Sequence, residues 1–147
     1  NIIVSGLTIM SGYVADEENT KKVLKDGKIY SADLGYVDEN GLIHLKGRLG
    51  DVINVGGFKV DPSEVENAAS SHESVKDCIC IAGTHPVIGT VLKLLVVLKD
   101  GKELDKKSIA VHIKSRLEPH KVPTYYEAVE SIQRTYNGKL DRKYYKK

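Results

Sequence analysis

The chain has 147 residues, of which 41% are hydrophobic and 29% are charged, and its formal net charge is +2. These proportions are ordinary for a folded globular protein, and a chain of this length can bury a core without disulfide staples. The small net charge argues against nucleic acid as a partner, and no apolar run is long enough for stable membrane insertion.

The first third of the chain is rich in turn signals. Asp26-Gly27 and the run DENG at 38–41 each separate short segments with strand character, such as 28–31 and 42–45. Two β-hairpins are therefore predicted here. The sequence starts without Met, directly in the apolar stretch 1–4, which favours the interpretation that it is a piece of a longer protein.

Beyond residue 51 the pattern predicts a small α+β domain. The predicted elements are, in order, a hairpin at Gly56-Gly57, a helix starting at Asp61-Pro62, strands at 75–82 and 91–98, a helix from Asp105 to about Leu117, and a strand at 123–129. This order predicts a small antiparallel sheet of about three strands packed by helices, preceded by the β-hairpins of the first third.

Cysteine and histidine placement argues against metal chemistry. Cys78 and Cys80 lie two apart in a predicted strand, so both side chains are expected on one face. They are interpreted as reduced packing residues of a cytoplasmic protein. The histidines show neither HxxxH nor HExxH spacing, so no metal site is predicted. The phosphate-loop patterns GxxxxGK[ST] and GxGxxG and the nucleophile pattern GxSxG are also absent.

Two stretches together resemble the adenylate-forming enzyme superfamily. They are SADLGYVDENGLIHLKGRLGDVINVGGFKVDPSEVE at 31–66 and RTYNGKLDRK at 134–143. Both follow the family patterns almost position by position. This superfamily contains acyl-CoA synthetases, the adenylation domains of peptide synthetases and luciferases. The long first stretch fixes many positions, so chance agreement is negligible.

The resemblance implies a domain organisation. Residues 1–48 would be the end of the large N-terminal domain, and residues 49–147 would be the mobile C-terminal domain. Gly50 falls at the hinge on which the small domain swings between two half-reactions, and a glycine there favours rotation. The family's phosphate loop and acyl pocket lie upstream of the matched part. The fragment alone is therefore predicted to be inactive.

The resemblance also implies roles for individual residues. Lys139 aligns with the catalytic lysine of adenylate formation. Asp33 aligns with the aspartate that accepts hydrogen bonds from the ATP ribose, and Arg48 with an arginine on the ribose side. Gly57 aligns with a glycine lining the pantetheine tunnel, and Lys59 lies where the family often has a basic residue near the acceptor site. Taken singly, most would pass for turn or surface residues, but their shared register favours the functional roles.

Three positions depart from the family pattern. Ala32 stands where a glycine usually precedes the ribose aspartate, and it is expected to leave Asp33 in place. Gly50 replaces the usual Asp or Lys of the hinge. Gln133 replaces the usual proline before Arg134.

The resemblance implies that the parent protein is an ATP-dependent, AMP-forming acid–thiol ligase of the acyl-CoA synthetase type. It would activate a small-molecule carboxylic acid as an acyl-adenylate and transfer the acyl group to CoA. ATP would be bound with Mg mainly by the missing N-terminal domain. Two alternatives stay open. NGKLDRK leans toward peptide synthetases, which favours an acyl carrier protein and its phosphopantetheine as acceptor, and the chain could instead be a non-catalytic docking module.

Overall fold

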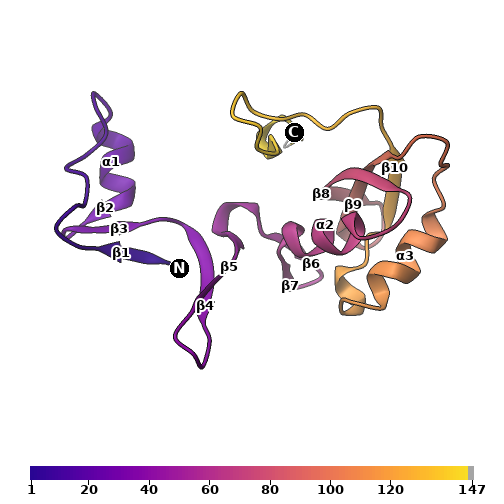
Figure 1. The fold of residues 1–147 in the computed structure, drawn as a ribbon, viewed down its shortest axis with the longest axis horizontal. Helices are drawn as coiled ribbons and strands as arrows, with labels where there is room; N and C mark the ends of the chain where they lie inside the picture. Colours follow the sequence, from indigo (N-terminus) through magenta and orange to yellow (C-terminus); the bar gives the residue numbers. More distant parts are fainter. Residues whose placement is uncertain (146–147) are drawn as a thin grey trace. The chain divides into compact units, whose positions relative to one another are not determined.

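The computed structural model describes residues 1–145, which form two compact units divided between Gly50 and Asp51. Figure 1 shows the elements of both units in chain order. Unit 1 is Asn1–Gly50, and unit 2 begins at Asp51.

Unit 1 consists of short strands and one helix. Its elements are β1 (Ile3–Ser5), α1 (Glu17–Val23), β2 (Leu24–Lys25), β3 (Lys28–Tyr30), β4 (Asp33–Val37) and β5 (Ile43–Arg48). The first three strands form a sheet in the order β1-β3-β2, and β4 pairs with β5 alone. The two hairpins expected from the sequence, β2–β3 and β4–β5, are confirmed. Asp26 and Gly27 both have positive φ, as a two-residue hairpin turn requires.

The β4–β5 hairpin brings its strands unusually close at Gly35. The register shifts between Leu34 and Gly35, which marks a β-bulge. A Cβ at Gly35 would lie 2.6 Å from the carbonyl oxygen of His44. Only glycine fits there without moving one of the strands.

Unit 2 carries the larger sheet. The short 3₁₀ segment η1 (Leu49–Asp51) spans the division between the units. The elements that follow it are β6 (Ile53–Val55), β7 (Phe58–Val60), α2 (Pro62–Ser70), β8 (Val75–His85), β9 (Gly89–Leu98), α3 (Lys106–Lys114), the 3₁₀ segment η2 (Pro119–Lys121), β10 (Tyr125–Ala128) and α4 (Arg142–Tyr145). The predicted α+β class, three-stranded sheet and β6–β7 hairpin are confirmed.

The three-stranded sheet has the order β10-β9-β8 and is mixed rather than purely antiparallel. β8 pairs with β9 antiparallel, as predicted, whereas β10 runs parallel to β9. The reason is the connection: the chain crosses over through α3 between β9 and β10, and such a crossover returns the chain in the same direction.

Aspartates start both long helices of unit 2. The Asp61 side chain accepts a hydrogen bond from the Ser63 N–H, and the Asp105 side chain accepts from Lys107 and Ser108. These bonds satisfy backbone donors that have no partner within the helix. The helix starts expected from the sequence are therefore where the structure has them.

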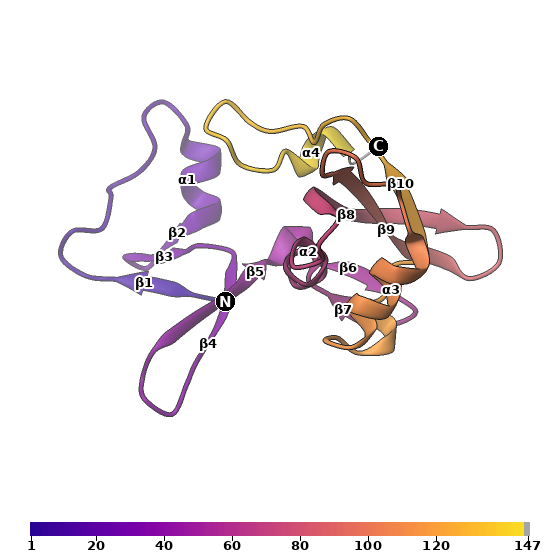
Figure 2. The ribbon, with the colours of Figure 1, turned by 45° about the vertical axis from the view of Figure 1, so that its right-hand side comes forward.

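The sheet of unit 2 is covered on both faces. One face packs against α2 and α3 through a core that includes Cys78, Cys80, Ile109 and Ile113. On the opposite face, Ile79 and Leu95 are covered by residues of the segment 129–145, namely Val129, Ile132, Leu140 and Tyr145. In Figure 2, α3 and α4 lie on opposite sides of this sheet. The terminal segment is therefore a packed layer of unit 2.

Candidate functional site

Asp33 and Arg48 face each other across the β4–β5 hairpin of unit 1. The Arg48 Nε–H donates to Asp33 Oδ1 at 3.0 Å, and the Asp33 N–H donates to Ser31 Oγ at 3.1 Å. Within the described residues, Asp33 Oδ2 has no hydrogen-bond partner, and the side chain is one-third exposed. An acceptor-only carboxylate with a free oxygen suits a ligand that donates from hydroxyl groups.

Ala32, which precedes this carboxylate, has a left-handed backbone with φ of +59°. Its carbonyl oxygen accepts a hydrogen bond from the Leu49 N–H at 2.9 Å, and the next carbonyl, of Asp33, accepts from Ile2 at 2.8 Å. These bonds hold the backbone in a conformation that glycine adopts more easily. The conformation accounts for the glycine at this place in the family pattern, and Asp33 nevertheless begins β4.

Gly57 and Lys59 belong to the β6–β7 hairpin of unit 2. Gly56 and Gly57 have φ of +56° and +91°, and Asn54 Oδ1 accepts the Gly57 N–H at 3.1 Å. A Cβ on Gly57 would meet no atom within 4 Å, so in this unit the turn geometry is what requires glycine. Its role beside a pantetheine stays a prediction. Lys59 is exposed and lies opposite Asn54.

Lys139 lies in a tight turn of the terminal segment. The Gly138 N–H donates to Thr135 O at 2.9 Å, and the Thr135 N–H donates to Lys139 O at 2.8 Å. Gly138 has φ of +81°, whereas Asn137 does not have positive φ. The turn therefore uses one left-handed residue, Gly138. In the part of the chain described, the Lys139 ammonium has no hydrogen-bond or ion-pair partner, and the residue is exposed.

Arg134 links the N-terminal side of this turn to the sheet by hydrogen bonds. Its Nη1 donates to Gly138 O at 3.0 Å, and its Nη2 lies 2.7 Å from Asp77 Oδ2 on β8. The isolated bridge between Arg134 and Leu140 closes the same loop. The backbone that carries Lys139 is therefore fixed to β8.

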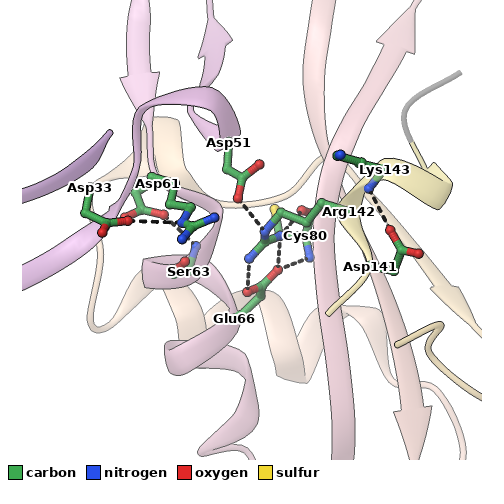
Figure 3. Close-up of polar contacts among 10 residues, drawn as sticks. Asp33, Asp51, Asp61, Ser63, Glu66, Cys80, Asp141, Arg142 and Lys143 are labelled. Atoms are coloured by element: carbon green, nitrogen blue, oxygen red, sulfur yellow. Dashed lines mark hydrogen bonds and ion pairs between the residues drawn. The ribbon is translucent and has the colours of Figure 1, made fainter. Parts of the chain in front are cut away.

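Arg142 links the C-terminal side of the Lys139 turn to α2. Its Nη1 and Nη2 each lie 2.7 Å from one oxygen of the Glu66 carboxylate, and its Nε lies 3.3 Å from Asp51 Oδ2. Glu66 Oε1 also accepts the Cys80 N–H at 2.7 Å. Figure 3 shows the Arg142 guanidinium between the two carboxylates. Burial opposes the charge of Arg142, but hydrogen bonding to Glu66 and the charges of Glu66 and Asp51 outweigh it, so the Arg142 pKa is raised.

Sequence reasoning missed this ion-pair cluster of Arg142, Glu66 and Asp51. Arg142 is one of several cations near the C-terminus, and its partner Glu66 lies far away in the sequence. One signal was present. Glu66 follows Val65 and precedes Ala69 by three positions, so it lies at the edge of the apolar face of α2. A charge in that position is buried and needs a partner.

The candidate residues fall into three groups by their place in the chain. Asp33 and Arg48 pair in unit 1, Gly57 and Lys59 share a hairpin of unit 2, and Lys139 lies on the terminal segment. Gly50 lies within η1, where a Cβ would meet no atom within 4 Å. Nothing in the described chain opposes a side chain there, so the hinge role of Gly50 stays a prediction.

Other features limit the chemistry of the chain. Among residues 1–145, no group of three or more His, Cys, Asp or Glu side chains could hold a metal ion. No helix formed by these residues is long and apolar enough to span a membrane. Cys78 and Cys80 are free and buried, and burial raises the pKa of the Cys78 thiol to about 11. Neither thiol is suited to act as a nucleophile.

Comparison with known proteins gives a consistent result. The sequence model of a family described as "AMP-binding enzyme C-terminal domain" matches residues 64–139. A long-chain-fatty-acid–CoA ligase from Bacillus subtilis is 37% identical over 142 residues, which are 97% of this chain and 25% of the relative. The chain thus spans about a quarter of that relative's length.

Solved structures agree with the sequence relatives. The structure of o-succinylbenzoate CoA synthetase from Bacillus subtilis, in complex with its acyl-adenylate intermediate, aligns with a TM-score of 0.90 and 27% identity over 99% of this chain and 30% of that one. The structure of an amide bond synthetase from Marinactinospora thermotolerans aligns with a TM-score of 0.86 and 32% identity over 97% of this chain and 29% of that one.

Proposed function

Because the chain belongs to the family of AMP-binding enzyme C-terminal domains, we propose that it is the C-terminal part of an ATP-dependent, AMP-forming acid–thiol ligase. Residues 1–48 are the end of the large domain, and residues 49–147 are the mobile domain. The enzyme joins a carboxylic acid to the α-phosphate of ATP, releases pyrophosphate, and transfers the acyl group to a thiol with release of AMP.

The observation that carries this proposal is that Lys139 is exposed on a turn whose backbone is held in place. Its ammonium has no partner within the described residues, while the turn beneath it is held by hydrogen bonds and by Arg134. A carboxylate that approaches a triphosphate needs a cation between the two anions. A lysine with three donors, held on a fixed turn, can supply that charge at small entropic cost.

The other residues serve ATP and the thiol. Asp33, with its free oxygen, accepts from the ribose hydroxyls, and Arg48 holds that carboxylate in place. Rotation about Gly50 exchanges Lys139 for the β6–β7 hairpin, where Gly57 lines the thiol route and Lys59 attracts the phosphates of the acceptor. The Mg that accompanies ATP is assigned to the upstream domain, as the resemblance implies.

CoA is the proposed acceptor, because several similar relatives are named CoA ligases or synthetases. Acids as different as long-chain fatty acids and o-succinylbenzoate occur in the names of these relatives, so a carboxylic acid is the extent of the substrate assignment. The free, buried cysteines support a cytoplasmic location.

The decisive experiment separates the two half-reactions in the intact gene product that carries this chain. Lys139→Ala should reduce ATP–pyrophosphate exchange by roughly 10²-fold, the usual effect of losing one charge-stabilising group. Thioester formation from a supplied acyl-adenylate should stay nearly unchanged. Lys143→Ala, which removes a neighbouring exposed cation, is the control. Equal losses in both half-reactions would contradict the assigned role of Lys139.

Two further measurements separate the alternatives. The isolated 147-residue chain should show no exchange above background, because the family's phosphate loop and acyl pocket are not in it. Turnover of the intact protein should saturate with free CoA. Turnover with only a phosphopantetheine-bearing carrier protein would identify that acceptor instead, and no turnover with any acid would favour a docking module.

A further inference from the structure

The ion-pair cluster around Arg142 is a buried polar site of unit 2. All three guanidinium nitrogens of Arg142 are engaged, with Glu66, with Asp51 and with the Cys80 carbonyl oxygen. The side chains of Arg142 and Glu66 are only 14% and 9% exposed. A buried, bidentate arginine–carboxylate pair fixes both distance and orientation.

This cluster and Arg134 hold the Lys139 turn from its two sides. Arg134 binds Asp77 on β8, and Arg142 binds Glu66 on α2. Between them the chain is also held by backbone bonds, in which the Asp141 N–H donates to Gln133 O at 3.0 Å. The Tyr145 hydroxyl accepts the Gln133 N–H at 2.9 Å.

Lys139 depends on these anchors more than a catalytic side chain in a core would. Its ammonium has no hydrogen bond or ion pair within the described chain, so only the backbone of the turn fixes where the side chain begins. That backbone is three residues from Arg142 in sequence. Asp51, the first residue of unit 2, belongs to the same cluster, so Arg142 ties the turn to the start of the unit.

We propose that Arg142 is a positioning residue for adenylate formation, which holds the Lys139 turn rigidly to α2, β8 and Asp51. The inference rests on the proposed function, because it assigns Lys139 to the first half-reaction. Arg142 itself does not touch substrate in this mechanism. It acts through Lys139, so its effect should exist only while Lys139 is present.

The test is a double-mutant cycle in the intact gene product. Arg142→Gln is combined with Glu66→Gln, so that neither member of the buried Arg142–Glu66 pair is left charged without the other, and the Cys80 N–H keeps an acceptor. This double variant, which neutralises Arg142 and Glu66 and leaves Asp51 charged, should lower ATP–pyrophosphate exchange by about 10- to 100-fold, since a misplacement of about 1 Å costs up to roughly 10²-fold. In the Lys139→Ala background the same two substitutions should lower exchange less than about twofold.

Two controls distinguish positioning from damage to the fold. Lys143→Gln removes a cation from the same segment, and Lys143 is exposed, with its N–H donating to Asp141 Oδ1. It should leave both half-reactions within about twofold. In the double variant, hydrogen exchange should quicken at amides of 134–141 and stay unchanged along β8 and β9, and thioester formation from a supplied acyl-adenylate should be preserved.

The outcomes are separable. Wild-type protein without exchange for any acid would overturn the proposed function, and this inference with it. Wild-type exchange combined with equal losses in the presence and absence of Lys139 would overturn the positioning role alone. A matching loss of thioester formation, or unchanged hydrogen exchange at 134–141, would overturn it as well.

Discussion

Replacing Glu66 with alanine should destabilise unit 2 more than any surface change, and its cost can be worked out from the contacts. Removing one member of a buried ion pair costs about 3–5 kcal/mol. Arg142 keeps Asp51 and the Cys80 carbonyl as partners, so the low end applies. The Cys80 N–H also loses its acceptor, which adds about 1 kcal/mol or more. The expected total is about 4 kcal/mol.

Urea unfolding of the purified chain, followed by circular dichroism and tyrosine fluorescence, measures this cost. In thermal unfolding, a loss of about 4 kcal/mol corresponds to a fall in Tm of roughly 15–30 °C for a unit of this size. Glu73→Ala is the matched control, because Glu73 is an exposed acid whose contact with Lys102 is 3.5 Å long. It should change stability by less than about 0.5 kcal/mol. If Glu66→Ala costs no more than Glu73→Ala, the buried pair contributes nothing and the reasoning fails.

Three smaller predictions concern single positions. Ala32→Gly should raise the Tm of unit 1, measured by scanning calorimetry, because it removes the strain of a left-handed alanine. The gain in stability should be about 1 kcal/mol or less. Gly35→Ala should lower the Tm of unit 1, because the added Cβ would clash with the His44 carbonyl oxygen. The loss of stability should be about 1–3 kcal/mol. Burial, the Arg116 charge and His72 lower the pKa of His112, so its contribution to the stability of unit 2 is complete above about pH 6.5 and is lost as the pH falls. His112→Gln should therefore make the free energy of unfolding of unit 2 depend less on pH between pH 7.5 and 5. An unchanged pH dependence would contradict this.

Local signals in the sequence predicted the elements well. Asp26-Gly27 and Gly56-Gly57 gave hairpins, and Asp61 and Asp105 gave helix starts, because these residues satisfy or tolerate the backbone within a few positions. The predicted strands 75–82 and 91–98 proved too short. β8 and β9 continue to His85 and Gly89, since pairing between the strands extends them into polar sequence.

Long-range features of the site could not be predicted in the same way. The pair Arg142–Glu66 joins residues whose contact only the folded sheet and α2 create. The parallel direction of β10 depends on how the α3 crossover packs, which no local pattern encodes. Conversely, the resemblance pointed to Lys139 as a functional residue, and the structure adds how Arg134 and Arg142 hold its backbone.

The burial of Cys78 and Cys80 has a practical consequence for attaching labels to the chain. A thiol with a pKa of about 11 carries only a trace of thiolate at neutral pH, and both sulfurs are shielded by α2. Maleimide dyes should therefore not react with Cys78 or Cys80 in the folded protein. A cysteine introduced at the exposed positions Ser5 or Tyr136 would be labelled selectively without removing the native pair. Labels at both positions would report the separation of the two units by energy transfer.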